Sequence, residues 1–107
     1  MIIKLDHRDI RVIGIPEHPK HVGVFKDQEC LIEIVDNQSS QQQAETLIHE
    51  LLHAIWATRG LPNRITEEAC VTRLASGVAT VIRDNPGLLH RLELALKGEL
   101  PLFKKGE

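Results

Sequence analysis

Hydrophobic and polar residues alternate with a period of two in the first third of the chain. The run Ile10–Ile15 begins with this alternation and stops at Pro16, and Val22–Phe25 is a second, shorter run. The run Cys30–Val35 carries the strongest pattern. Because successive side chains of a strand point to opposite faces of a sheet, these runs predict three β-strands. Residues 26–28 have the composition of a turn, so we expect the last two strands to form a hairpin.

From residue 38 onward, apolar residues recur at every third or fourth position, which is the period of an α-helix. Ser39 or Ser40 is a suitable N-cap for a first helix that runs to about Arg59, and Gly60 is a suitable terminator. One stripe of this helix is apolar, and we expect it to face the core: Ala44, Ile48, Leu51, Leu52 and Ile55.

Two further helices follow. Thr66 is a suitable N-cap for a second helix that ends at about Asp84, because the residue before Pro86 disfavours helical backbone angles. The third helix covers Leu88–Leu96 and ends at Gly98. The predicted buried face of the second helix consists of Val71, Leu74, Ala75, Val78, Val81 and Ile82.

Strands followed by helices predict an α+β fold, in which a small antiparallel or mixed sheet precedes three helices. A chain of 107 residues is long enough for one hydrophobic core and too short for two. We therefore expect a single domain over 1–107, mainly β over 1–37, helical over 38–98, and ending in a tail at 99–107 that is loosely held from Pro101 onward.

The composition argues against several classes of function. A net charge of −2 and an isoelectric point near 6.3 give no basis for nucleic-acid binding. No apolar run is long enough to span a membrane, and Met1–Asp6 lacks the apolar core of a signal peptide. Cys30 and Cys70 stand apart without C-x-x-C spacing, which favours two reduced thiols. We expect a cytoplasmic protein without nucleic-acid or membrane partners.

The residues His49-Glu50-Leu51-Leu52-His53 read H-E-x-x-H within the first predicted helix. Side chains four residues apart lie one above the other on a helix, so both imidazoles can bind one metal ion. Glu50 lies beside them, where it could accept a proton from a metal-bound water. Both histidines point away from the predicted apolar stripe, and Thr46, Trp56 and Ala57 surround them.

A catalytic zinc ion takes three protein ligands and leaves a fourth position for water, so the motif needs a third ligand. Glu67 and Glu68 open the second predicted helix, which a short loop folds back towards the first. Glu68 shares its side of the helix with small residues that allow two helices to come close, namely Thr72, Ala75 and Ala79. We therefore predict Glu68 as the third ligand, with Glu67 as the alternative. Carboxylates in a first helical turn also interact favourably with the helix dipole without binding metal.

Three stretches of the sequence resemble a known family. They read T-L-I-H-E-L-L-H-A-I-W over 46–56, E-E-A-C-V-T-R-L-A over 67–75 and R-D-N-P over 83–86. These stretches are similar to the small H-E-x-x-H metallopeptidase-like proteins of phages and prophages, and more distantly to ImmA/IrrE-type and other gluzincin peptidases.

The resemblance implies a minimal zincin-like domain whose zinc ligands are His49, His53 and either Glu68 or Glu67, with Glu50 as the general base. The chain departs from the family in having no tyrosine to stabilise an oxyanion. Its glutamate pair also follows the second histidine sooner than in the larger gluzincins.

These features predict a zinc-dependent metallopeptidase that hydrolyses a protein or peptide substrate, in the bacterial cytoplasm if the gene is phage-borne. The strand Leu31–Val35 leads to the motif helix, so we expect it to pair with an extended substrate. A donor for the negatively charged tetrahedral intermediate is also needed, and the candidates are Arg73, Arg83 and His90.

Two alternatives use the same residues differently. In the first, the chain is a catalytically inactive zinc-binding scaffold with a regulatory or interaction role, completed by a partner or as a homodimer. In the second, it is a structural or regulatory phage protein whose motif histidines face solvent. The remaining histidines of the N-terminal third, His7, His18 and His21, lack helical spacing, and we expect them in surface or loop roles.

Overall fold

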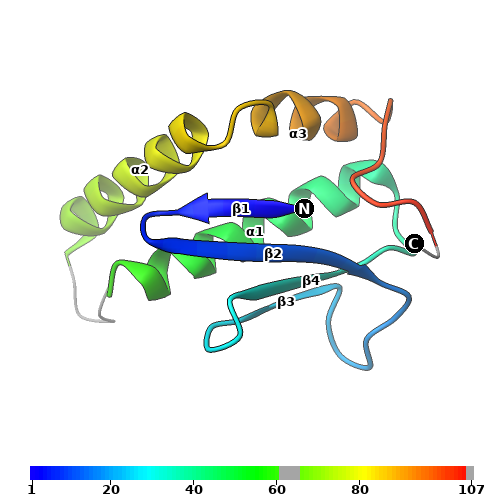
Figure 1. Cartoon of the computed structure of the whole chain (residues 1–107), viewed down its shortest axis with the longest axis horizontal. Coiled ribbons are helices and arrows are strands. Elements are labelled where there is room, and N and C mark those ends of the chain that lie inside the picture. Colours follow the sequence, from blue (N-terminus) through cyan, green and yellow to red (C-terminus); the bar gives the residue numbers. More distant parts are fainter. Residues whose placement is uncertain (61–65, 106–107) are drawn as a thin grey trace.

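The computed structural model describes residues 1–60 and 66–105. Over these residues the chain forms four strands and then three helices (Figure 1), which confirms the predicted α+β fold. The elements are β1 (Ile2–Leu5), β2 (Arg8–Ile15), β3 (Gly23–Lys26), β4 (Leu31–Val35), α1 (Ser40–Thr58), α2 (Glu67–Asp84) and α3 (Leu88–Leu96). The predicted strands do not include β1, in which the buried residues Ile3 and Leu5 alternate with the exposed residues Ile2 and Lys4.

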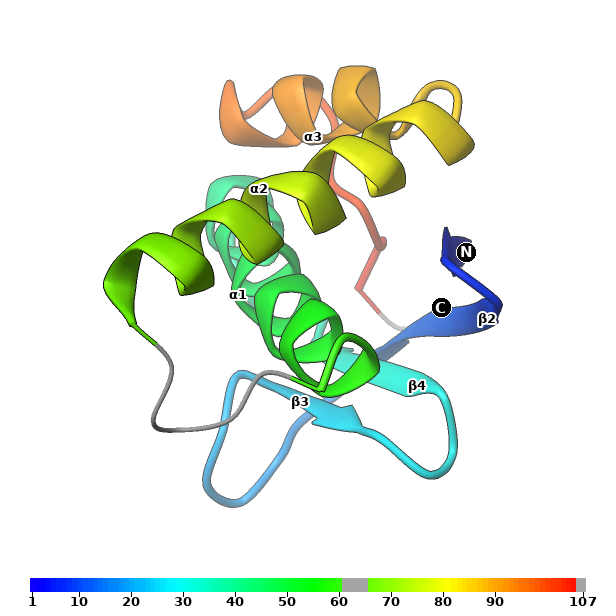
Figure 2. The same cartoon turned by 90° about the vertical axis from the view of Figure 1, so that its left-hand side faces the viewer.

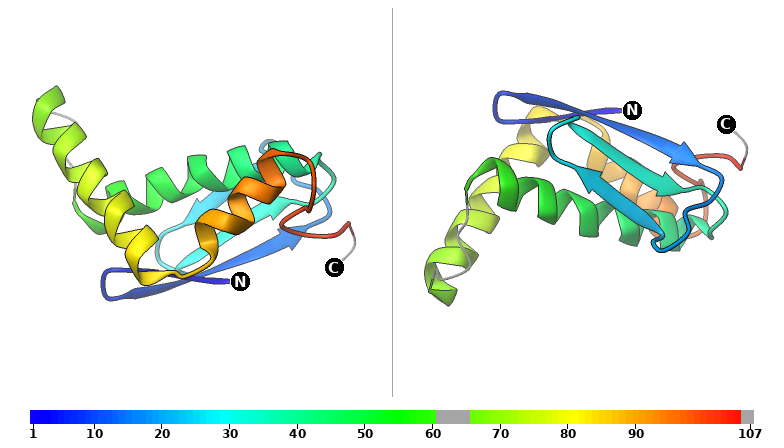
Figure 3. Two further views of the ribbon diagram at one scale, coloured as in Figure 1. Left: turned by 90° about the horizontal axis from the view of Figure 1, so that it is seen from above. Right: turned by 90° about the horizontal axis from the view of Figure 1, so that it is seen from below.

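The sheet is mixed, with the strand order β1-β2-β4-β3. The pairs β1–β2 and β3–β4 are antiparallel, whereas the central pair β2–β4 is parallel, with Val12 opposite Ile32. β3 is therefore an edge strand, and it lies beside α1 (Figure 3, right). The expectation that Leu31–Val35 offers an edge to a substrate is wrong, because β2 and β3 pair with both of its edges.

The helices cover one face of the sheet. α1 lies against β3 and β4, α2 packs against both β1 and α1, and α3 packs against α1 (Figure 2). Burial of each large aliphatic side chain at these contacts contributes about 1.5–3 kcal/mol. The core that fixes α1 in place includes Ile3, Leu5, Ile10, Val12, Ile32, Ile34, Leu47, Leu51, Ile55, Val81 and Leu92.

The predicted helix ends are confirmed by their capping contacts. The Ser39 hydroxyl accepts a hydrogen bond from the backbone N–H of Gln42, whose side chain accepts one from the backbone N–H of Ser39. The Thr66 hydroxyl caps α2 by accepting from the N–H of Ala69. Gly60 follows α1 with a φ of +61°, a conformation that favours glycine at a helix end.

The buried face of α1 is rotated towards its polar side relative to the predicted apolar stripe. Ile48 and Leu52 are 38% and 41% exposed, whereas Thr46 and Glu50 are buried. The cause is β3, which passes so close to α1 that a Cβ atom on Gly23 would lie 2.4 Å from Cγ2 of Thr46. The prediction is wrong for Ile48 and Leu52 because the helical period does not show which strand covers the helix.

α2 buries a narrower face than predicted. Val81 is buried and Leu74 is half-buried, so these two residues are placed correctly. The other four members of the predicted face are exposed, namely Val71, Ala75, Val78 and Ile82.

The contact between α1 and α2 is centred on a glycine. A Cβ atom on Gly77 would lie 2.5 Å from Cγ2 of Ile55, so the missing side chain lets the two helices meet there. The small residues Thr72, Ala75 and Ala79 are exposed instead of lining this contact. The prediction that they form the close approach between the helices is therefore wrong.

The segment 101–103 is held more firmly than predicted. Leu102 is buried, and the backbone N–H and carbonyl of Phe103 each form a 3.0 Å hydrogen bond with the side chain of Gln43. The expectation of a loose tail is wrong for this segment. Residues 106 and 107 lie outside the described part of the chain.

Cys30 and Cys70 are free thiols, as predicted. Over residues 1–60 and 66–105, no helix combines the length and the apolar character needed to cross a bilayer.

Candidate metal centre

The two motif histidines lie together on the exposed side of α1. Nε2 of His49 and Nε2 of His53 are 3.2 Å apart, and the two rings meet edge to face with their centroids separated by 4.8 Å. Two nitrogen ligands of a tetrahedral zinc ion, each about 2.0–2.1 Å from the metal, lie about 3.3 Å from one another. The spacing of the ring nitrogens therefore fits a shared zinc ion.

Glu50 lies beside this pair in a different environment. Glu50 is buried, with 7% of its surface exposed, whereas both histidines are exposed. A carboxylate oxygen of Glu50 is 4.0 Å from Nε2 of His49, and the potential ligand atoms of the three side chains all lie within 4.8 Å of one another. Within the part of the chain that the structure describes, this is the one group of three side chains able to hold a metal ion.

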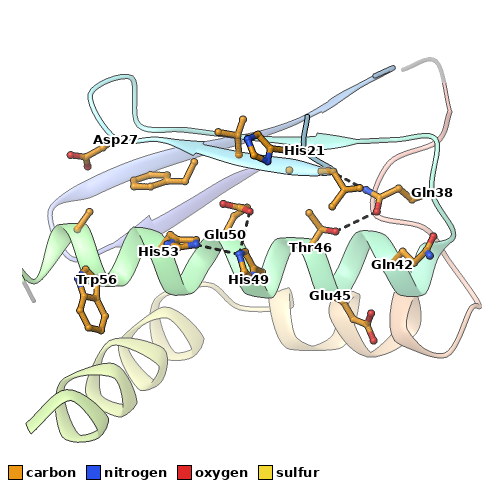
Figure 4. Close-up of a pocket in the computed structure, with 15 residues that line it drawn as sticks. His21, Asp27, Gln38, Gln42, Glu45, Thr46, His49, Glu50, His53 and Trp56 are labelled. Atoms are coloured by element: carbon orange, nitrogen blue, oxygen red, sulfur yellow. Dashed lines mark hydrogen bonds and ion pairs between the residues drawn. The ribbon is translucent and has the colours of Figure 1, made fainter. Parts of the chain in front are cut away.

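The three side chains line a groove of about 890 Å³ between α1 and the segment that carries β3 (Figure 4). Thr46, Trp56 and Ala57 lie beside the histidines, as predicted. The helical wall also includes Gln42 and Glu45, and the opposite wall consists of His21, Val22, Gly23, Val24, Phe25 and Asp27, with Gln38 at one end.

Hydrogen bonds fix the end of the groove at Gln38. The amide nitrogen of Gln38 donates to the carbonyl of Val35 at 2.6 Å and to that of Val22 at 3.3 Å. Its amide oxygen accepts a 3.4 Å hydrogen bond from the hydroxyl of Thr46. Gln38 thereby ties the start of the strand wall to the helical wall.

Arg8 fixes the other end of the groove. Its guanidinium donates to Asp27 at 2.8 Å and to the hydroxyl of Thr58 at 3.0 Å, and it also bonds the backbone carbonyl of Asp27. The hydrogen bond to Cys30 Sγ, together with the bond to Asp27, raises the pKa of Arg8 above its usual value against the opposing effect of burial. Asp27 is therefore paired with a permanent cation.

Glu68 is not brought to the motif in this structure. It is exposed in the first turn of α2 and does not belong to the group formed by His49, Glu50 and His53. α2 meets α1 at Gly77, nine residues after Glu68, which corresponds to about 13 Å along a helix axis. The partner residue on α1, Ile55, also lies about 200° around that helix from His53.

The assignment of Glu68, or of its neighbour Glu67, as the third ligand therefore stays a prediction. The prediction assumes that α2 comes close to α1 along the small residues on the side of Glu68. In the structure the two helices come close at Gly77 instead.

The candidate donors Arg73, Arg83 and His90 do not line the groove. Arg83 pairs with Asp84 at 2.8 Å, and His90 lies on α3, 3.9 Å from Glu93. His21, which was expected in a surface or loop role, is exposed and also lines the groove across from the motif (Figure 4). His21 precedes β3, and no short-range pattern in the sequence marks it for this position.

Comparison of the chain with protein-family models, with curated proteins and with solved structures finds no match.

Proposed function

We propose that the chain is a zinc-dependent metallopeptidase. The observation that carries the proposal is the pair of ring nitrogens of His49 and His53, 3.2 Å apart and next to the Glu50 carboxylate in an open groove. The resemblance of residues 46–86 to phage and prophage metallopeptidase-like proteins supports it. We accordingly propose that the protein acts in the bacterial cytoplasm.

The donor set suits zinc, because imidazole nitrogens and carboxylate oxygens are ordinary zinc ligands. His49 and His53 would hold the ion. The resemblance assigns the third ligand to Glu68 or Glu67 in the first turn of α2, and neither belongs to the group of close ligand atoms in this structure. A zinc ion bound there would act as a Lewis acid, which lowers the pKa of a bound water and polarises a peptide carbonyl.

Glu50 would act as the general base and then as the general acid. Its carboxylate accepts a proton from water as the water oxygen attacks the peptide carbonyl carbon. When the C–N bond breaks, the same group returns the proton to the leaving amine nitrogen. Glu50 lies close to β3: the residue is 7% exposed, and a Cβ atom added to Gly23 would lie 3.4 Å from its Cγ.

The proposed substrate is an extended stretch of protein or peptide. β3 pairs only with β4 among the described strands, so its other edge has backbone groups available for a peptide to bind. The groove runs between this strand and α1 and passes both histidines. A peptide added to β3 would therefore place one of its carbonyl groups near the motif.

The proposal is tested by measuring how Glu50→Gln changes the rate of peptide hydrolysis and the zinc content. The amide cannot take up a proton, so we expect hydrolysis of a library of internally quenched peptides to fall by about 10²–10⁴-fold. We expect zinc content to remain at the wild-type level. Wild-type rates in the variant, or no cleavage by the zinc-loaded wild type, would contradict the proposal.

A second candidate function is that of an inactive zinc-binding scaffold. It is favoured by the composition of the metal-ligand group, because Glu50 supplies its only carboxylate within the described residues. A carboxylate that binds the ion directly is not available as a base. In that case Glu50→Gln would lower zinc affinity itself, which separates the two candidates.

A further inference from the structure

His21 and the metal-binding motif lie on opposite walls of the same groove. His21 belongs to the segment leading into β3, while His49, Glu50 and His53 belong to α1 (Figure 4). His21 is not part of the group of close ligand atoms. The space between the walls thus has potential metal ligands on one side and an imidazole on the other.

The backbone around His21 is fixed from both directions. Nδ1 of His18 accepts 3.1 Å hydrogen bonds from the backbone N–H groups of Lys20 and His21, and the two histidine rings pack at 5.3 Å. On the other side, Val22 continues the β3–β4 ladder by accepting a 2.9 Å bond from the N–H of Val35. These bonds hold the backbone at His21 in place along the groove, and its ring packs against His18.

Two other polar donors along the groove are already engaged, since Gln38 donates to two backbone carbonyls and Thr46 donates to Gln38. Gln42 and Trp56 also carry side-chain N–H groups, but both belong to α1, the wall that carries the motif (Figure 4). Among the residues that the structure describes, no hydrogen bond engages the ring nitrogens of His21. The chain also has no tyrosine. An imidazole always carries at least one N–H, so His21 can donate without breaking an internal bond.

We propose that His21 is a catalytic residue that donates a hydrogen bond to the peptide carbonyl oxygen as this oxygen becomes negatively charged. The inference rests on the proposed function, because it requires a peptide bond to be attacked beside Glu50. Donors aimed at such an oxygen are effective because they are positioned before charge develops. In this role His21 binds the substrate and not the zinc ion, so the proposed third zinc ligand is still Glu68 or Glu67.

The test compares His21→Ala and His21→Gln with His7→Ala, which removes an exposed histidine outside the groove. The probe is an N-phosphoryl dipeptide, whose tetrahedral phosphoryl oxygens imitate the charged intermediate. Zinc content, thermal unfolding and probe affinity are measured for each protein. We expect unchanged zinc content, probe binding about 10²-fold weaker in His21→Ala, and partial recovery in His21→Gln, which keeps an N–H donor.

The outcomes separate this inference from the proposed function. Equal probe affinity in wild type and His21→Ala would overturn the inference while zinc binding stands. Loss of zinc from His21→Ala would overturn it by making His21 a ligand, and so would failure of the zinc-loaded wild type to bind the probe. A wild type that binds no zinc would overturn the proposed function and the inference together.

Discussion

Gln43 connects three parts of the molecule from a fully enclosed position on α1. Its side chain is 1% exposed and donates to the backbone carbonyls of Asp36 and Phe103 at 3.1 and 3.0 Å. Its amide oxygen accepts from the N–H of Phe103. One amide thus joins the end of the sheet and the C-terminal segment to α1.

We expect Gln43→Leu to destabilise the protein by about 2–4 kcal/mol, because one buried and two partly buried backbone groups lose their partner while the side-chain volume is nearly kept. Urea unfolding measures the change in the free energy of unfolding. Gln41→Leu, at an exposed position in the same helical turn, is the matched control and should change it by no more than about 0.5 kcal/mol. Equal effects of the two substitutions would contradict the role assigned to Gln43.

At the scale of single residues, the sequence predicts the motif well because its geometry is local. His49 and His53 are brought together by the helix alone, and Glu50 by being next in the chain. His21 comes to the groove through the fold of the sheet, which no short-range pattern shows. The hydrogen bonds between Gln43 and Phe103, which is 60 positions away, also cannot be predicted from a local sequence pattern.

Secondary-structure elements show the same division between local and long-range causes. The ends of α1 and α2 follow from capping residues that lie next to them, and these ends are predicted correctly. The face that each helix buries depends on what packs against it. β3 covers Thr46 and Glu50 on α1, and Gly77 decides where α2 makes contact, so both predicted faces are partly wrong.

The contact of α1 with α2 gives a prediction at this scale. Alanine is favoured over glycine inside a helix by about 1 kcal/mol, yet we expect Gly77→Ala to destabilise the protein by about 1–3 kcal/mol. The reason is the 2.5 Å approach that its Cβ atom would make to Cγ2 of Ile55.

A double-mutant cycle with Ile55→Ala isolates this contact. Ile55→Ala removes the Cγ2 atom, so adding Gly77→Ala to that background should be neutral or stabilising. The free energies of unfolding of the four proteins measure the coupling. A cost of Gly77→Ala that is the same in both backgrounds would show that the two residues do not meet as described.

At the scale of the whole molecule, the strand order creates the site. The parallel pairing of β2 with β4 puts β3 at the edge, directly beside the polar side of α1. The sequence predicts the α+β class and the β3–β4 hairpin, since both follow from patterns along the chain. It does not predict the order of strands, because pairing between distant strands depends on the assembled core.

The central claim is that His49 and His53 bind one zinc ion, and the most direct test is zinc titration of protein purified without a histidine tag. We predict about one zinc per chain and, at free zinc of 100 times the dissociation constant, about 2.7 kcal/mol of added stability. His49→Ala and His53→Ala should each abolish this gain, and His7→Ala should keep it. Less than about 0.2 zinc per wild-type chain, with no rise in the unfolding temperature on adding zinc, would contradict the claim.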